Sequence, residues 1–207
     1  MNVMDLILFI SAGALLWSRS IRLGIALLAL EGTLLSIMAL TSEPLTWGSA
    51  LMALATLAVK AGLIPFVLYR MMNSWPAEVR RDHPLPLWAY ATALVVVIGT
   101  GHVMQLLGPA HLIQSRPAFF FSLSTIYLGM VMIVARRHLL SQITALVSIE
   151  NGLVIFGVSF SGSLPTFVEL GILADLAIAV ALLAWMGHRI HREFETTDVV
   201  ALQSLKG

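Results

Sequence analysis

Residues 49–69 read SALMALATLAVKAGLIPFVLY, an apolar run of 21 residues with a single charge, Lys60, near its centre. A helix needs about 20 apolar residues to cross the hydrocarbon core of a bilayer. Only helices and closed barrels satisfy their backbone polar groups there, and this run is too long and too continuously apolar for a barrel strand. The run therefore predicts a transmembrane helix, kinked at Pro65, which follows Lys60 by five residues.

The rest of the chain has the same apolar character. Of its 207 residues, 58% are hydrophobic and 11% are charged, whereas soluble domains have about 25% charged residues. Hydropathy predicts an all-α integral membrane protein with seven transmembrane helices, separated by segments that contain proline or glycine. The predicted spans are Val3–Trp17, Leu23–Leu40, Ser49–Tyr69, Leu87–Leu107, Ala118–Val134, Ile143–Phe160 and Thr166–Trp185.

The basic residues predict how the spans are oriented. Of the 12 lysines and arginines, all except Lys60 and Arg116 fall on one side of the membrane if the spans alternate in direction. These residues are Arg19, Arg22, Arg70, Arg80, Arg81, Arg136, Arg137, Arg189, Arg192 and Lys206. By the positive-inside rule, we expect the N-terminus outside and the C-terminus in the cytoplasm.

Four ionisable residues lie near the middle of predicted spans: Glu31, Lys60, Glu150 and Asp175. Each such charge costs roughly 2.5–3.5 kcal/mol on insertion scales, so intramembrane charges usually face a bundle interior and mark an ion or proton path. Their similar depth predicts a row of groups suited to lateral proton movement. The alternative is a set of buried ion pairs, for instance Glu31 with Lys60, that only orient the helices.

Three further residues are secondary candidates for the path: His102, Glu169 and Tyr127. His102 is able to extend a proton path, but a hydrogen-bonded structural histidine explains it equally well. Glu169, near the outer end of the last span, fits an interfacial position better than a relay. Tyr127 fits a helix–helix hydrogen bond as well as a water ligand.

Two segments of the chain resemble each other. Residues 26–32 read ALLALEG and residues 145–152 read ALVSIENG; basic residues precede both, and a span with a central ionisable group follows both. The pattern predicts two parallel three-helix units joined by the fourth span, although apolar helices also resemble each other through composition alone. The predicted divisions are 1–70 for the first unit, 71–117 for a cytoplasmic loop, span four and outer loop, 118–188 for the second unit and 189–207 for a cytoplasmic tail.

The sequence contains no recognisable catalytic motif. Cysteine is absent, which excludes thiolate chemistry, and no phosphate-binding glycine loop or nucleophile–base pattern is present. His188 and His191 have metal-ligand spacing, but no acidic partner motif accompanies them. We therefore expect no catalytic centre, no metal, no cofactor and no nucleic-acid partner, and either a self-contained carrier or one membrane subunit of a larger machine.

The second half of the chain carries a family resemblance. Residues 137–143 (RHLLSQI), 149–152 (IENG) and 168–172 (VELGI), the last followed by Asp175, resemble the family of hydrogenase-4 component E, a membrane protein. The C-terminal residues 198–207 resemble the ending of that component. The family is in turn similar to the K subunit of respiratory complex I and to the C subunit of Mrp-type cation/proton antiporters.

The resemblance implies a membrane component of a group 4 NiFe-hydrogenase or formate hydrogenlyase complex, in which electron transfer in a peripheral arm drives proton translocation. The implied partners are antiporter-like and other membrane subunits, and indirectly the NiFe-hydrogenase arm, in a prokaryotic inner membrane. Glu31 and Glu150 match the intramembrane glutamates of the family, Lys60 resembles the lysine of antiporter-like subunits, and Asp175 stands where a glutamate is expected. A stand-alone ion or small-solute transporter and a purely structural spacer are the alternatives.

Overall fold

The computed structural model describes residues 3–42, 47–74, 82–106, 113, 115–161 and 166–194. The elements within them are the helices α1 (Val3–Trp17), α2 (Ile21–Ser42), α3 (Trp47–Thr56), η1 (Leu57–Leu63), α4 (Ile64–Asn73), α5 (Leu87–Leu106), α6 (Arg116–Ala135), α7 (Leu139–Ser161) and α8 (Thr166–Phe194). The helices α3, η1 and α4 are consecutive and together span Trp47–Asn73. Six helices of this described part are long and apolar enough to cross a membrane, and α1 is a shorter apolar helix. The prediction of an all-helical, seven-helix membrane protein is confirmed.

The helix ends lie close to the predicted ones. α1 has the predicted bounds, and α5 ends one residue earlier than expected. The other helices extend the predicted spans by a few residues, because hydropathy detects the apolar part of a helix and misses its polar ends. The largest extension is at the end of α8, which continues to Phe194.

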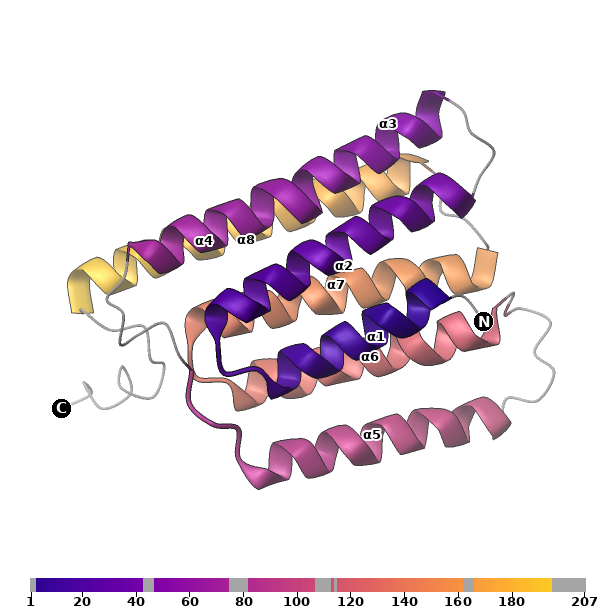
Figure 1. The fold of residues 1–207 in the computed structure, drawn as a ribbon, viewed down its shortest axis with the longest axis horizontal. Coiled ribbons are helices and arrows are strands. Elements are labelled where there is room, and N and C mark those ends of the chain that lie inside the picture. Colours follow the sequence, from indigo (N-terminus) through magenta and orange to yellow (C-terminus); the bar gives the residue numbers. More distant parts are fainter. Residues whose placement is uncertain are drawn as a thin grey trace.

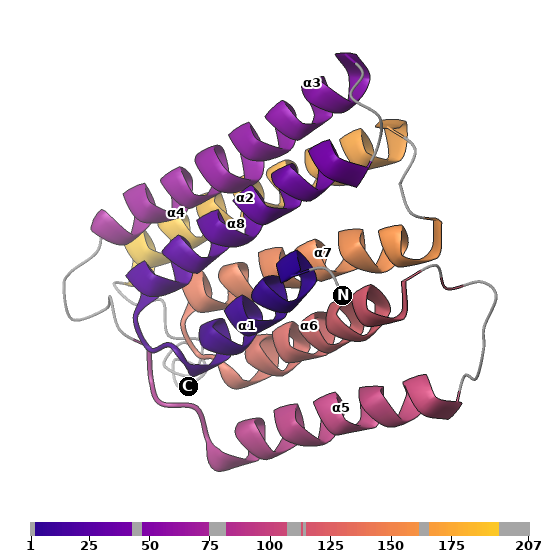
Figure 2. The same cartoon turned by 45° about the vertical axis from the view of Figure 1, so that its right-hand side comes forward.

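The helices are arranged in two layers (Figures 1 and 2). α1, α2 and the α3–η1–α4 helix form one layer, and α6, α7 and α8 form the other. Each helix packs against its counterpart: α1 against α6, α2 against α7, and α3 with α4 against α8. α5 lies at one edge of the assembly, against α6. The helices before α5 form the first layer and those after it form the second; the division of the chain into two similar three-helix units remains a prediction.

Successive helices run in opposite directions (Figure 1). The last turns of α1, α4, α6 and α8 consequently lie together, at the end of the bundle where α2, α5 and α7 begin. Described arginines at this end include Arg19, Arg70, Arg136, Arg137 and Arg189. We call it the basic end.

The irregularity expected at Pro65 takes the form of a π-helical segment. Proline has no backbone N–H, and in a regular α-helix its ring collides with the carbonyl group four residues earlier, here that of Ala61. The segment η1 just before it is π-helical, and the N–H of Ile64 donates to the carbonyl oxygen of Val59, five residues back. The wider π turn lets the helix continue through the proline, and it places Lys60 in the middle of the irregular segment.

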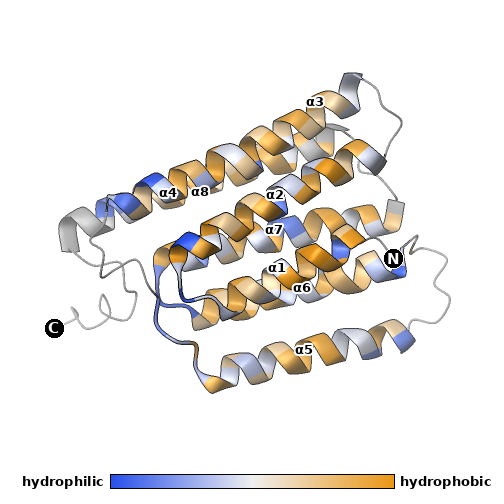
Figure 3. Ribbon diagram, in the orientation of Figure 1, coloured by the Kyte–Doolittle hydropathy of each residue, from blue (hydrophilic) through white to orange (hydrophobic). Residues whose placement is uncertain are grey.

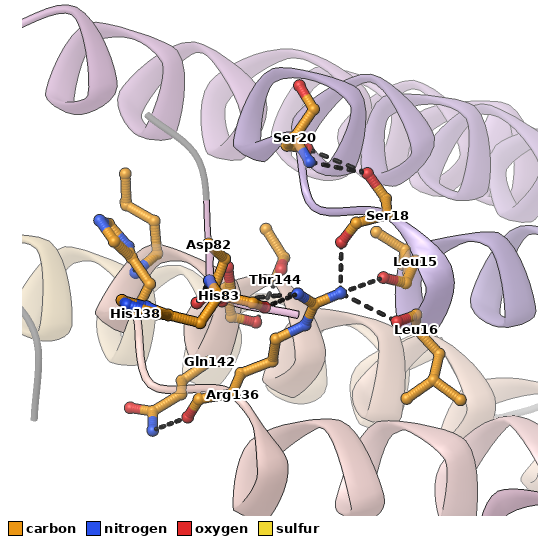
Figure 4. A network of polar contacts seen from close by, with 12 residues as sticks. Leu15, Leu16, Ser18, Ser20, Asp82, His83, Arg136, His138, Gln142 and Thr144 are labelled. Atoms are coloured by element: carbon orange, nitrogen blue, oxygen red, sulfur yellow. Dashed lines mark hydrogen bonds and ion pairs between the residues drawn. The ribbon is translucent and has the colours of Figure 1, made fainter. Parts of the chain in front are cut away.

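A buried arginine connects the loops at the basic end (Figure 4). The side chain of Arg136 is 2% exposed and donates hydrogen bonds to four backbone carbonyl groups. The acceptors are the carbonyl oxygens of Leu15, Leu16, Ser18 and His83. The carbonyls at the end of a helix have no donors within that helix, so Arg136, from the α6–α7 connection, caps the C-terminal end of α1.

Asp82 supplies the negative charge beside this arginine. Its Oδ2 lies 3.7 Å from Nη1 of Arg136, and its backbone N–H donates to the carbonyl oxygen of Arg19 at 2.9 Å. Burial lowers the pKa of Arg136, and the carboxylate of Asp82 acts in the opposite direction. The segment before α5 is thereby attached to both the α1–α2 and the α6–α7 connections.

Candidate functional site: a buried polar network within the helices

Three of the four predicted path residues meet inside the bundle. Nζ of Lys60 donates to Oε2 of Glu150 at 2.5 Å and to Oδ1 of Asn151 at 3.1 Å. Nδ2 of Asn151 donates to Oε2 of Glu31 at 2.9 Å, and Oγ of Ser148 donates to Oε1 of Glu31 at 3.3 Å. These bonds join η1, α7 and α2 in one network, which we call the central network.

The central network is shielded from the surroundings of the bundle. Glu31 and Asn151 are 0% exposed, Lys60 is 3% exposed and Glu150 is 14% exposed. Figure 3 shows a hydrophilic stretch in the middle of α7, the helix of Glu150 and Asn151, whereas most of the ribbon around it is hydrophobic. The hydroxyl group of Ser11, from α1, lies beside Glu31 without the geometry of a hydrogen bond.

The charges of the central network suit a site that exchanges protons. The network contains one ammonium group, on Lys60, and two carboxyl groups, on Glu31 and Glu150. One added proton on a carboxyl group makes the whole network neutral, and neutrality is strongly favoured where the effective dielectric constant is low. The position of that proton on one carboxyl group changes the proton affinity of the other. The arrangement is therefore able to take up, hold and release a proton.

A glycine allows the close approach that forms the network. A Cβ atom on Gly32 would lie 2.6 Å from the carbonyl carbon of Lys60 and 2.7 Å from the backbone nitrogen of Ala61. The backbone of α2 therefore touches the π segment directly, next to Glu31. A side chain at this position would separate the two helices and move Lys60 relative to α7.

The α6–α7 pair holds the other side of the network in the same way. A Cβ on Gly129 would lie 2.4 Å from Cγ1 of Ile149, and a Cβ on Gly152 would lie 2.9 Å from Cγ1 of Ile126. Small residues at such positions let helices in a membrane pack closely. Both contacts flank Glu150 along α7, which fixes the helix that carries it.

A small cavity borders the network beside Lys60. Its volume is about 30 Å³, and it lies on the side of Lys60 that faces away from the basic end. The lining residues are Leu35, Ala39, Thr56, Lys60, Val154, Ile172 and Leu173. A water molecule needs about 10–15 Å³ of such space, so the cavity has room for about two waters next to the lysine.

The structure places Asp175, the fourth predicted residue, outside the central network. Its side chain is exposed on α8. The two carboxylates of Asp175 and Glu150 are near enough for Coulomb repulsion between them. Asp175 therefore neighbours the network electrostatically but lies on the surface of the bundle.

The secondary candidates do not join the network where the structure describes them. His102 is exposed on α5, at the edge of the bundle, and Tyr127 on α6 is 39% exposed. Glu169 lies in the first turn of α8, and its side chain is outside the described part of the structure. The Glu31–Lys60 ion pair, given as an example of the structural alternative, is not formed directly: Asn151 connects the two side chains, and Lys60 pairs with Glu150.

Two of the polar residues of the bundle interior that sequence reasoning missed stand out. The first is Asn151. It directly follows Glu150 inside an apolar span, and this position of a polar amide could have indicated its part in the network. The second is Asp5, which is 1% exposed and whose two carboxyl oxygens have no hydrogen-bond partner among the described residues. It lies on the buried stripe of α1 that also contains Leu8 and Ser11, and this i, i+3 spacing was its signal.

The sequence of this chain is similar to that of several known proteins. Residues 117–207 match the family model of NADH-ubiquinone/plastoquinone oxidoreductase chain 4L. An uncharacterized protein of Mycobacterium tuberculosis strain H37Rv is 26% identical over 209 residues, which cover 96% of this chain and 92% of that protein. Hydrogenase-4 component E of Escherichia coli K12 is 27% identical over 149 residues, which cover 72% of this chain and 69% of that protein. No solved structure matches the chain significantly.

The fold and the central network define a multi-pass membrane protein with ionisable groups paired inside its helices. The second half of this chain, residues 117–207, is similar to the oxidoreductase chain 4L family. Over 149 residues the chain is also similar to hydrogenase-4 component E.

Proposed function

We propose that the chain is a non-catalytic membrane subunit of a proton-translocating, complex I-like hydrogenase or formate hydrogenlyase complex. The observation that carries the proposal is the connection from Glu31 through Asn151 to Lys60 and Glu150, buried where three helices meet. The family supports the kind of complex, since the relatives include hydrogenase-4 component E and the matching family model is that of an oxidoreductase chain.

In this proposal each residue of the network has a distinct role. Glu31, Lys60 and Glu150 hold and release the proton, because their side chains exist in protonated and deprotonated forms. Asn151 positions its neighbours, because an amide donates and accepts hydrogen bonds but does not titrate. Waters in the cavity contact Lys60 on the side that faces away from the basic end. Asp175, exposed near Glu150, is the next carrier toward a neighbouring subunit.

The chemistry of the network favours a proton over a sodium ion. A sodium ion bound inside a membrane protein needs oxygen ligands around it, whereas here a lysine ammonium occupies the position between Glu150 and Asn151. An ammonium group repels a second cation nearby. We therefore propose that the network conducts protons.

The proposal includes a setting for the chain. Antiporter-like membrane subunits are its direct neighbours, and a NiFe-hydrogenase arm is an indirect partner. The location is a prokaryotic inner membrane. The arginines gathered at the basic end support a cytoplasmic position for that end, by the positive-inside rule.

The test replaces each glutamate by glutamine in the assembled complex. Glutamine keeps the size and the hydrogen-bonding capacity of glutamate but cannot carry the proton. We expect Glu150→Gln and Glu31→Gln to lower proton translocation into membrane vesicles at least about tenfold relative to electron transfer. A suitable control is Thr100→Val on α5, which removes a hydroxyl group that is buried but donates only within its own helix.

Two results would instead support the alternative functions, a structural spacer or a stand-alone transporter. If Glu150→Gln leaves electron transfer and proton translocation both at wild-type levels, Glu150 is no relay residue and its pairing with Lys60 is structural. If the chain purified alone is stable and transports ions in liposomes, it is a stand-alone carrier rather than a subunit.

A further inference from the structure

The exposed face of α8 carries a charge in the middle of an apolar surface. Asp175 is exposed, and so are its neighbours on the same face of the helix. Among these, Ile178 is 60% exposed and Leu182 is 55% exposed, while a Cβ atom on Gly171 would meet nothing within 4 Å. The face therefore combines small residues, large apolar residues and one carboxylate.

Asp175 lies deep within the membrane-spanning part of the bundle. α8 runs in the same direction as the α3–η1–α4 helix, and a Cβ on Gly187 would lie 2.6 Å from Cε of Met71. Met71 and Gly187 therefore lie at about the same depth in the bundle. The residue 11 positions before Met71 is Lys60, and the residue 11 positions before Gly187 is Leu176, which is next to Asp175. Lys60 is near the centre of its 27-residue span, so Asp175 is at about the same depth.

A carboxylate at this depth needs a polar or cationic environment. Charged side chains within membrane spans face the protein interior or a water-filled cavity, and they pair with other polar groups. The neighbouring carboxylate of Glu150, on α7, repels Asp175. The exposed side of Asp175 faces away from the described part of the chain, so a compensating group fits there on a partner.

We propose that this face of α8 binds a transmembrane helix of a different membrane subunit, which places a lysine, arginine or histidine opposite Asp175. Charge complementarity supports this occupant, and the small residues Gly171 and Ala174 let a second helix approach closely. Lipid alone leaves the carboxylate in hydrocarbon. A symmetric contact with a second copy of the chain brings two Asp175 carboxylates together, which repel. The inference rests on the part of the proposed function that gives the chain neighbouring membrane subunits, and it does not require that the central network conducts protons.

The test is site-specific photocrosslinking in the native membrane complex. A photoreactive amino acid at Ile178, one turn from Asp175 on the same face, is compared with one at Val95, which is 67% exposed on α5. We expect position 178 to crosslink to a multi-pass membrane protein, within about two helical turns of a lysine, arginine or histidine in its span. A crosslink to lipid only, to a second copy of this chain, or to a span without a basic residue overturns the proposal.

A charge exchange tests the chemistry of the contact. Asp175→Lys should reduce the crosslink from position 178 at least fivefold, and replacing the basic residue of the partner by Asp in the same strain should restore it. The crosslinking pattern from Val95 should stay the same, because α5 lies on another side of the bundle. If Asp175→Lys prevents accumulation of the chain, Asp175→Asn serves instead and should weaken the crosslink severalfold. An unchanged crosslink in either variant overturns the proposal, whereas loss of proton translocation in the glutamate variants does not bear on it.

Discussion

Nζ of Lys60 lies 2.5 Å from Oε2 of Glu150, although the two residues are 90 positions apart in the sequence. The pair joins the first layer of helices to the second at a point where both side chains are largely removed from the surface. Removing one member of a buried ion pair leaves the other charge uncompensated, whereas replacing both members by apolar residues is often tolerated.

The first prediction follows from this pair. Lys60→Met should lower the free energy of unfolding in mixed micelles by about 3 kcal/mol, because Glu150 loses its counter-charge and Asn151 loses a donor. The double variant Lys60→Met with Glu150→Leu should lose clearly less than the two single variants together. Additive losses in this double-mutant cycle would mean that the two side chains do not interact energetically.

The second prediction concerns the bridge formed by Asn151. Asn151→Leu removes the donor to Glu31 and the acceptor for Lys60, both of which are buried, and should cost about 1–3 kcal/mol in the same unfolding measurement. Ser148→Ala is the matched comparison, because it removes only one longer bond to Glu31, of 3.3 Å. An equal or larger loss for Ser148→Ala would argue against Asn151 as the principal support of Glu31.

The third prediction tests the contact between α2 and the π segment. Gly32→Ala places a methyl group against the backbone of Lys60, which has no rotamer to change, and overpacking of this kind costs about 1–3 kcal/mol. Gly99→Ala on α5 is the control, since a Cβ there meets nothing within 4 Å. Alanine is the better helix former, so the control should be neutral or stabilising. Equal thermal stability of the two variants would contradict the close contact.

The fourth prediction concerns the cap at the basic end. Arg136→Met leaves the terminal carbonyls of α1 without their donor and Asp82 without its counter-charge, so the loss should be about 3–5 kcal/mol. Arg137→Met removes an equal charge from the exposed neighbouring position and should change stability by less than about 0.5 kcal/mol. Similar melting temperatures for the two variants would show that the cap contributes little.

The fifth prediction has the opposite sign. Asp5→Leu should stabilise the chain by about 1 kcal/mol or more, because the carboxyl oxygens of Asp5 are buried with no hydrogen-bond partner in the described part of the chain. The same substitution should leave the helix content measured by circular dichroism unchanged. A clear loss of stability would indicate that Asp5 is bound to a group outside the described residues.

Much of this architecture could be predicted from the sequence. Continuous apolar runs determine the existence, number and approximate ends of membrane helices, because the thickness of the bilayer sets their length. The bounds of α1 were predicted without error, while the end of α8 at Phe194 was missed because its last turns are polar. The π segment was predicted only as an irregularity at Pro65, since proline excludes a regular turn but does not specify what replaces it.

The candidate site was predicted in part. Glu31, Lys60 and Glu150 were predicted because a charged side chain within a membrane span costs free energy and is therefore rare unless it has a role. The pairing depends on how the two layers meet, and depth along separate helices says nothing about the direction in which a side chain points. For this reason the sequence did not indicate that Lys60 bonds to Glu150, or that Asp175, expected in the row, lies on the surface of the bundle.

The π segment around Lys60 has a consequence for rotation about the helix axis. A π turn contains one more residue than an α turn, so its location sets the direction of the side chains around it. In an α-helix a shift of one residue turns a side chain by about 100°. If the wide turn moved along the helix past Lys60, the ammonium group would swing away from Glu150 while the helix ends stayed in place. The hydrogen bond between Lys60 and Glu150, which connects the two layers, therefore depends on the position of the π turn along the helix.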